Sequence, residues 1–216
     1  MKRKLLSKRG ISALVTLLLS VIWTVTAGVA DVSAIGPMGS PVGLSTLNAA
    51  VRDLVGVRME LYELTDILGL VPIAVALGYA IVGAAELIGG RSLWRVDRRI
   101  LALGGLYIAL GVVFVGFELI PLNYRPVLIE GVLEASYPSS TTLLVMTVIP
   151  AFLIDVATRV KKKRIFWVIF TVSAAFCAFV VAARILSGVH WFSDIVGGLL
   201  ISATLVLSYS ALMPRE

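Results

Sequence analysis

The only histidine among the 216 residues lies in a short segment that also holds an arginine and an aspartate. Arg184 precedes His190 by six positions, and Asp194 follows it by four. In a helical segment His190 and Asp194 share one face, so that the carboxylate can hold one imidazole nitrogen and leave the other free as a nucleophile or base. The guanidinium of Arg184 can bind a pair of phosphate oxygens. The spacing allows phosphoryl chemistry, but a lone histidine is more often a structural residue, so this segment alone does not decide.

Two further polar stretches could complete a phosphate site. One contains Tyr124 and Arg125, and the other opens a helical pattern with Pro138, Ser139 and Ser140. Pro138 suits the first turn of a helix, where free backbone N–H groups, hydroxyls and the positive end of the helix dipole attract anions. Serine at a helix start is also an ordinary N-cap, and an arginine near a membrane face can be an interface anchor. Taken with the histidine segment, these stretches favour a phosphate site.

Membrane-spanning helices are the elements that must position these residues. Hydrophobic residues make up 59% of the chain and charged residues 15%, whereas soluble domains carry about 25% charged residues. Six uncharged runs of 18 to 21 residues approach the roughly 20 residues that a spanning helix needs. We therefore expect an all-α polytopic membrane bundle of six transmembrane helices, forming a single membrane domain over residues 1–216. The expected spans are about 10–30, 67–88, 100–122, 139–158, 165–184 and 194–213.

The Lys and Arg residues divide unevenly between the two sets of connecting segments. One set holds only Arg52, Arg58, Arg125 and Arg184, and the other 15 of the 19 basic residues lie in the opposite set and the two ends of the chain. The positive-inside rule then predicts that both termini are cytoplasmic and that the three polar stretches lie at the outer face. The basic runs also explain the net charge of +6 as anchors for anionic lipid heads. We expect no nucleic-acid partner.

The longest outer segment, residues 31–62, contains a second helical pattern. Apolar residues recur at helical spacing over about 44–60, with polar residues between them. This pattern predicts an amphipathic outer helix, either a packed connector or a lid over a route for lipid, and the connector is the favoured interpretation.

Cys177 is the only cysteine, and acidic residues do not cluster at metal-ligand spacing, so we expect no intrachain disulfide, no metal and no cofactor.

The histidine segment resembles the third motif of the type-2 phosphatidate phosphatase superfamily, a group of integral-membrane lipid phosphatases. That motif, S-R-x5-H-x3-D, is similar to Arg184, His190 and Asp194, with Ala183 where serine is usual. The resemblance covers roughly residues 100–214 and includes the six-span topology.

The other two motifs of that family are matched less closely. The second, P-S-G-H, is similar to the segment from Pro138 to Thr141, and the first, K-x6-R-P, is similar to Arg125-Pro126, with Glu118 at the lysine position. The order, the spacing and the common membrane face of the three motifs make the resemblance strong.

The resemblance implies a role for each matching residue. His190 would attack phosphorus to form a phosphohistidine, and Asp194 would orient the imidazole. Phosphate-binding residues would be Arg125, Ser139, Ser140 and Arg184, with Glu118, Tyr124 and Pro138 as further possible members of the site. Such a reaction consists largely of positioning and charge stabilisation and is metal-independent.

Thr141 is the main departure from the family pattern. The family has a histidine there, which protonates the leaving alkoxide, and a threonine hydroxyl cannot act as a general acid near neutral pH. Losing a general acid costs roughly 10²–10⁴-fold in rate. Three interpretations stay open: a phosphatase impaired by natural or engineered loss of this group, a diphosphatase, or an inactive protein that binds or transports a lipid phosphate. A diphosphatase needs little protonation because its leaving phosphate has a second pKa of about 6.

The function that we expect is a phosphoric-ester or diphosphate hydrolase acting on a phosphorylated lipid, impaired here because of Thr141. Phosphatidic acid and undecaprenyl diphosphate represent the two substrate classes, and the apolar tail would reach the site sideways between helices. The expected partners are this lipid and the bilayer, with the oligomeric state left open. The expected location is a bacterial cytoplasmic membrane, with the active site facing outside.

Overall fold

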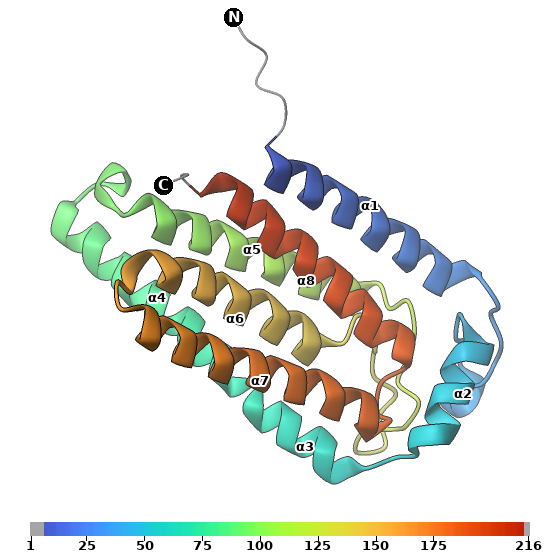
Figure 1. The fold of residues 1–216 in the computed structure, drawn as a ribbon. Helices are drawn as coiled ribbons and strands as arrows, with labels where there is room; N and C mark the ends of the chain where they lie inside the picture. Colours follow the sequence, from blue (N-terminus) through green and yellow to red (C-terminus); the bar gives the residue numbers. More distant parts are fainter. Residues whose placement is uncertain (1–6, 214–216) are drawn as a thin grey trace, which may run out of the picture.

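The fold is an all-helical bundle in which six helices are long and apolar enough to cross a membrane. The computed structural model describes residues 7–213, and within them the chain forms eight α-helices, two short 3₁₀ helices and no strand (Figure 1). The α-helices are α1 (Lys8–Val29), α2 (Ser45–Val55), α3 (Met59–Leu68), α4 (Leu70–Gly90), α5 (Arg98–Leu119), α6 (Ser140–Arg159), α7 (Lys163–Ser187) and α8 (Phe192–Leu212). The predicted fold class, a polytopic membrane bundle with six spans, is confirmed.

Helix α6 is the centre of the bundle. It contacts α4, α5, α7 and α8. In its most apolar stretch of 18 residues 56% of the residues are buried, compared with 11% in the corresponding stretch of α1. The outer helices instead turn large apolar side chains away from the protein, as Leu18 of α1, Ile81 of α4 and Ile108 of α5 show with exposed fractions of 60–70%. Such surfaces suit a hydrocarbon solvent, in which every spanning backbone group must bond within its own helix.

The connections differ between the two ends of the bundle. The 120–139 connection and the 30–58 segment with α2 gather at the end where α6 and α8 begin, which we call the long-loop end. At the other end, the short-loop end, α6 joins α7 through residues 160–162 and α4 joins α5 through 91–97, which include the 3₁₀ helix η2 (Leu93–Arg95). Helix α1 begins beside the last turn of α8 at that end, where Arg9 Nη1 donates to the Ser210 carbonyl at 3.2 Å. The longer connections therefore lie at the long-loop end.

The second span begins earlier than the uncharged run indicates. Helix α3 starts at Met59 and leads through Gly69, itself in right-handed helical geometry, into α4, so that Met59–Gly90 forms one candidate span of 32 residues. The acidic residues of α3 end the uncharged run but do not end the helix. As a result, Asp66 lies within the bundle rather than in a loop before it.

Helix α2 is attached to the segment that carries the histidine. Asn48 is buried, donates from Nδ2 to Ser193 Oγ at 2.9 Å and accepts from the Ser193 backbone N–H at 3.0 Å. The guanidinium of Arg52 lies 5.7 Å from the centre of the Trp191 ring. The helix ends at Gly56 with a positive φ of 68°. Residues 31–58 therefore pack as a connector over the start of α8.

Candidate active site

The turn between α7 and α8 directs His190 into the bundle at the long-loop end. Helix α7 ends at Gly188, whose φ is +63°. A Cβ atom at Gly188 would lie only 1.9 Å from the Gly56 carbonyl oxygen, so the turn requires glycine for both its backbone geometry and its close approach to the 56–58 segment. The Arg58 N–H also bonds to the Ser187 carbonyl at 2.9 Å. This close packing places His190 beside Arg184 of α7 and against Arg125 and Ser136 of the 120–139 connection.

The two imidazole nitrogens of His190 have different surroundings. Nδ1 lies 3.2 Å from the Ser136 carbonyl oxygen, which can only accept, so this nitrogen carries the proton. Nε2 then has a free lone pair, and it faces Arg125 Nη1 at 3.2 Å and Arg184 Nη2 at 3.3 Å. The nitrogen that can act as a nucleophile is therefore surrounded by two groups that bind phosphate.

The position of His190 also keeps its imidazole neutral. Burial lowers the pKa of His190 well below its ordinary value, and the positive charges of Arg125 and Arg184 lower this pKa further. At neutral pH the ring therefore keeps the Nε2 lone pair that a nucleophile needs.

Asp194 lies behind the imidazole rather than directly against it. Its Oδ2 is 3.8 Å from His190 Nδ1 and accepts the Trp191 backbone N–H at 2.9 Å. Its Oδ1 accepts weak bonds from Asn123 Nδ2 at 3.4 Å and from Ser193 Oγ at 3.5 Å. The carboxylate thus caps the first turn of α8 and adds negative charge near Nδ1, while the Ser136 carbonyl makes the hydrogen bond that the sequence assigned to Asp194.

Arg125 is held by contacts from its own loop. Its side chain is 9% exposed, and its Nε lies 3.0 Å from Glu134 Oε2, a carboxylate that is 38% exposed. Its backbone N–H bonds to the Glu134 carbonyl at 3.0 Å. The guanidinium also lies 5.3 Å from the centre of the Tyr62 ring.

Arg184 is held by helix α3. Its side chain is 1% exposed, and Nη1 lies 3.0 Å from both Asp66 Oδ1 and Thr65 Oγ1. The guanidinium is 4.8 Å from the centre of the Tyr62 ring, so one aromatic ring contacts both arginines. Among the described residues Arg184 Nε has no hydrogen-bond partner, and this leaves the guanidinium with spare capacity for an anion.

The start of α6 contributes two serines with different environments. Ser139 is fully buried: its N–H bonds to the Asp194 carbonyl at 3.1 Å, and its hydroxyl accepts from Thr142 Oγ1 at 3.1 Å. Ser140 instead lines a small cavity together with Arg125 and His190. Ser140 is therefore the serine that a phosphate can reach directly.

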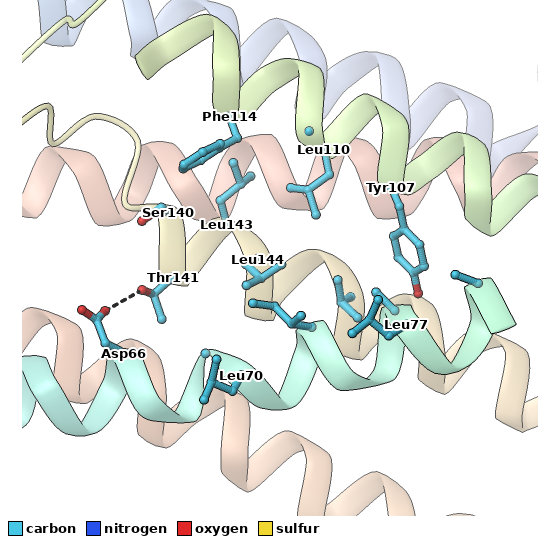
Figure 2. A pocket seen from close by; sticks show the side chains of 16 residues that line it. Asp66, Leu70, Leu77, Tyr107, Leu110, Phe114, Ser140, Thr141, Leu143 and Leu144 are labelled. Carbon is cyan, nitrogen blue, oxygen red and sulfur yellow. Dashed lines mark hydrogen bonds between the residues drawn. The ribbon is translucent and has the colours of Figure 1, made fainter. Parts of the chain in front are cut away.

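Two cavities meet at this point. The small one, of about 140 Å³, is lined by Arg125, Glu134, Ser136, Pro138, Ser140 and His190, with Glu118 at its edge. The larger one, of about 590 Å³, is mainly apolar and lies between α4, α5 and α6, with Asp66, Ser140 and Thr141 at its polar end (Figure 2). Ser140 and Phe114 line both cavities. A phosphate in the small cavity and an apolar chain in the large one could thus belong to one molecule.

Two residues that the sequence analysis named as possible members of the site lie at its edge or outside it, and two residues that it did not name lie against the arginines. Glu118 is exposed at the edge of the small cavity, and the Tyr124 carbonyl accepts from Trp191 Nε1 at 2.6 Å rather than lining that cavity. Tyr62 and Asp66 were not predicted, although their i, i+4 spacing on a helix was a signal for a shared face. Within residues 7–213 no group of three or more His, Cys, Asp or Glu side chains is placed to hold a metal ion.

Comparisons with known proteins agree with this architecture. The model of the PAP2 superfamily matches residues 118–216. The fold is similar to the crystal structure of the first transmembrane PAP2 type phosphatidylglycerolphosphate phosphatase from Bacillus subtilis, with a TM-score of 0.59 and 15% sequence identity. That match covers 92% of this chain and 94% of the other, and at this identity it concerns the fold alone. No curated protein sequence matches the chain significantly.

Proposed function

Because the model of the PAP2 superfamily matches residues 118–216, the region that holds the sequence motifs, we propose that the chain is a membrane lipid phosphate or diphosphate phosphatase acting through a phosphohistidine on His190. The family match and the fold support a lipid phosphate phosphatase. The observation that carries the mechanism is the position of His190 Nε2, which lies 3.2 and 3.3 Å from the guanidinium groups of Arg125 and Arg184.

A phosphate in the small cavity would exchange the contacts that the arginines now make with Nε2 for contacts with its non-bridging oxygens. Both guanidinium groups are almost fully buried, so their charge is weakly screened by solvent and acts strongly on an anion. The hydroxyl and backbone of Ser140 at the start of α6 add neutral donors and the helix dipole. Phosphorus then comes to lie against Nε2.

The reaction has two steps. In the first, the Nε2 lone pair forms an N–P bond while the bond from phosphorus to the lipid oxygen breaks, and the electron pair leaves on that oxygen. The Ser136 carbonyl and the Asp194 carboxylate stabilise the positive imidazole ring from the Nδ1 side. In the second, a water oxygen attacks phosphorus, the N–P bond breaks, and its electrons return to Nε2, which releases phosphate and restores the neutral ring.

The larger cavity would hold the lipid tail. Its walls come from α4, α5 and α6 and consist mostly of Leu, Ile, Ala and Phe side chains. Apolar lining of this kind favours a hydrocarbon chain without selecting a head group. We place the phosphate site at the outer face of a bacterial cytoplasmic membrane, because most Lys and Arg residues within 7–213 lie at the short-loop end.

Because of Thr141, functions other than the hydrolysis of an alkyl phosphate stay open. Its hydroxyl cannot protonate an alkoxide, so turnover of an alkyl phosphate requires another proton donor. Without one, the chain would be an impaired phosphatase, a diphosphatase, or a protein that binds a lipid phosphate without cleaving it.

Phosphate release from detergent-solubilised protein tests the proposal. We expect release from a polyprenyl diphosphate, from phosphatidic acid, or from both, and a loss of at least about 10⁴-fold in His190→Gln, because removing a covalent nucleophile costs rate on that scale. Binding of both lipids without release from either would show a binding protein. Release that survives in His190→Gln would remove His190 from the nucleophile role.

A further inference from the structure

We propose that Asp66 donates the proton to the leaving oxygen of an alkyl phosphate, the role for which Thr141 has no suitable group. This inference rests on the proposed function, because it assigns a catalytic residue for the same reaction. Asp66 belongs to α3, outside the region that the family model matches.

Asp66 lies at the end of the larger cavity that adjoins the small one, beside Ser140, which lines both. Its Oδ1 accepts the Thr141 hydroxyl at 3.3 Å and lies 3.0 Å from Arg184 Nη1. Its side chain is 43% exposed, and it lines the polar end of the larger cavity beside Ser140 and Thr141 (Figure 2). The carboxyl group thus adjoins a phosphate-binding arginine and also opens toward the space for the lipid tail.

The position of the leaving oxygen follows from the chemistry of the substrate. This oxygen joins phosphorus to the tail, so with phosphorus against His190 and the tail in the large cavity it must lie where the two cavities meet. The residues that line both cavities are Phe114 and Ser140, and Thr141 and Asp66 lie beside Ser140 at the polar end of the larger cavity (Figure 2). Among the described residues, the other titratable side chain that lines the larger cavity is Tyr107, which lies toward its opposite end (Figure 2). Glu118 and Glu134 line the small cavity and not the larger one. Asp66 is therefore the acid on the side of the breaking bond that faces the lipid tail.

The substrate supplies the proton that Asp66 donates. Without substrate, the Asp66 carboxylate pairs with Arg184. A phosphate monoester that carries one proton and binds the same guanidinium comes next to this carboxylate, and the two groups then share that proton in a charge-assisted hydrogen bond. Substrate binding thus places the proton beside the leaving oxygen.

The proton balance is complete over the two steps. As the P–O bond breaks, the Asp66 O–H bond breaks as well, and its proton goes to the lipid oxygen, which leaves as an alcohol. The resulting carboxylate is held by the Thr141 hydroxyl and Arg184. In the second step it accepts a proton from the attacking water, so that Asp66 acts first as a general acid and then as a general base.

Asp66→Asn tests the inference, because it keeps the shape of the side chain and removes the proton. We expect a loss of about 10²–10⁴-fold in kcat on phosphatidic acid. On a polyprenyl diphosphate and on p-nitrophenyl phosphate, whose leaving groups need little protonation, the loss should stay below about 10-fold. Glu63→Gln is the matched control: it is an exposed acid on the same helix, and its removal should leave all three rates unchanged.

Rescue by a second variant separates proton donation from positioning. Thr141→His in the Asp66→Asn background places a titratable group at the other side of the same hydrogen bond, and it should restore at least about 10-fold of the activity on phosphatidic acid. Asp66→Glu, which keeps the acid and the ion pair with Arg184, should retain most of the activity and covers the case in which Asp66→Asn fails to fold.

The outcomes distinguish this inference from the proposed function. An equal loss on all three substrates in Asp66→Asn, without rescue by Thr141→His, would show that Asp66 only positions Arg184 and would overturn the inference. If the unmodified chain releases phosphate from none of the three, the proposed function itself fails.

Discussion

The two ends of the bundle each hold a cluster of charged residues, and the clusters have opposite designs. At the short-loop end the buried member is an anion: the Asp155 side chain is 1% exposed and lies 2.8 Å from Arg159 Nε, whose side chain is 46% exposed. At the long-loop end the two arginine–carboxylate pairs have the opposite order, with a buried cation and a more exposed anion. Arg184 is 1% exposed and pairs with Asp66, which is 43% exposed, while Arg125 is 9% exposed and pairs with Glu134, which is 38% exposed.

The difference shows which cluster is built to receive a ligand. Asp155 bonds inside the protein through Oδ2, which also accepts from Tyr79 OH at 2.7 Å, and its partner Arg159 bonds to Asp97 at 3.1 Å. Arg125 and Arg184 instead turn guanidinium nitrogens toward a neutral imidazole nitrogen, and their carboxylate partners sit at the edge of the cluster. The two buried arginines face the Nε2 side of His190, while the buried Asp194 carboxylate lies on the Nδ1 side, and this separation forms a preorganised site for a phosphate at Nε2. The short-loop cluster is structural, because its arginine is already bonded to two carboxylates.

The largest difference that we expect between the two clusters is in enzymatic activity when one arginine of each is replaced. Arg184→Met removes a cation that binds phosphate oxygens, and we expect kcat/KM for phosphate release to fall by about 10²–10³-fold, the cost of deleting one preorganised donor. Arg159→Met removes an arginine from the other cluster and should leave kcat/KM within about threefold. Similar losses in both variants would contradict the distinction between the clusters.

A smaller effect concerns stability and pH. The pKa of His190 in the folded protein lies well below its ordinary value of 6.5, mainly because of burial, so the unfolded chain binds the proton more readily. The stability that results is fully present above pH 6.5 and is lost as the pH falls from there toward the lower folded pKa, at up to about 1.4 kcal/mol for each pH unit.

His190→Gln provides the control for this pH effect. Between about pH 7 and pH 5, the unfolding temperature in detergent should drop more in the unmodified chain than in His190→Gln, since only the former carries the buried imidazole. Equal drops in the two proteins would show that His190 is not held neutral by burial and by the two arginines.

The fold, and the part of the site that consists of motif residues, could be predicted from the sequence because each depends on residues that are close together along the chain. Uncharged runs of spanning length predict the helices. His190, Arg184 and Arg125 lie in recognisable motifs that the topology brings to one end, and the structure places their side chains together.

The remaining parts of the site have no local signal. Tyr62 and Asp66 lie more than 100 residues before Arg184, and the charge of Asp66 ended the uncharged run, which placed this residue outside the predicted span. The Ser136 carbonyl that holds His190 Nδ1 is a backbone group, and any residue type could supply it. Only the packing of α3 against α7 and of the 120–139 connection against His190 brings these groups into the site.

The most direct test of phosphohistidine chemistry at this end of the bundle is covalent labelling with a ³²P-labelled polyprenyl diphosphate, followed by rapid denaturation. We expect label that is stable in alkali and labile in acid, located on the peptide that contains His190 and missing in His190→Gln. Turnover of the same lipid without any label on His190, under conditions in which a phosphohistidine standard survives, would contradict the proposed mechanism.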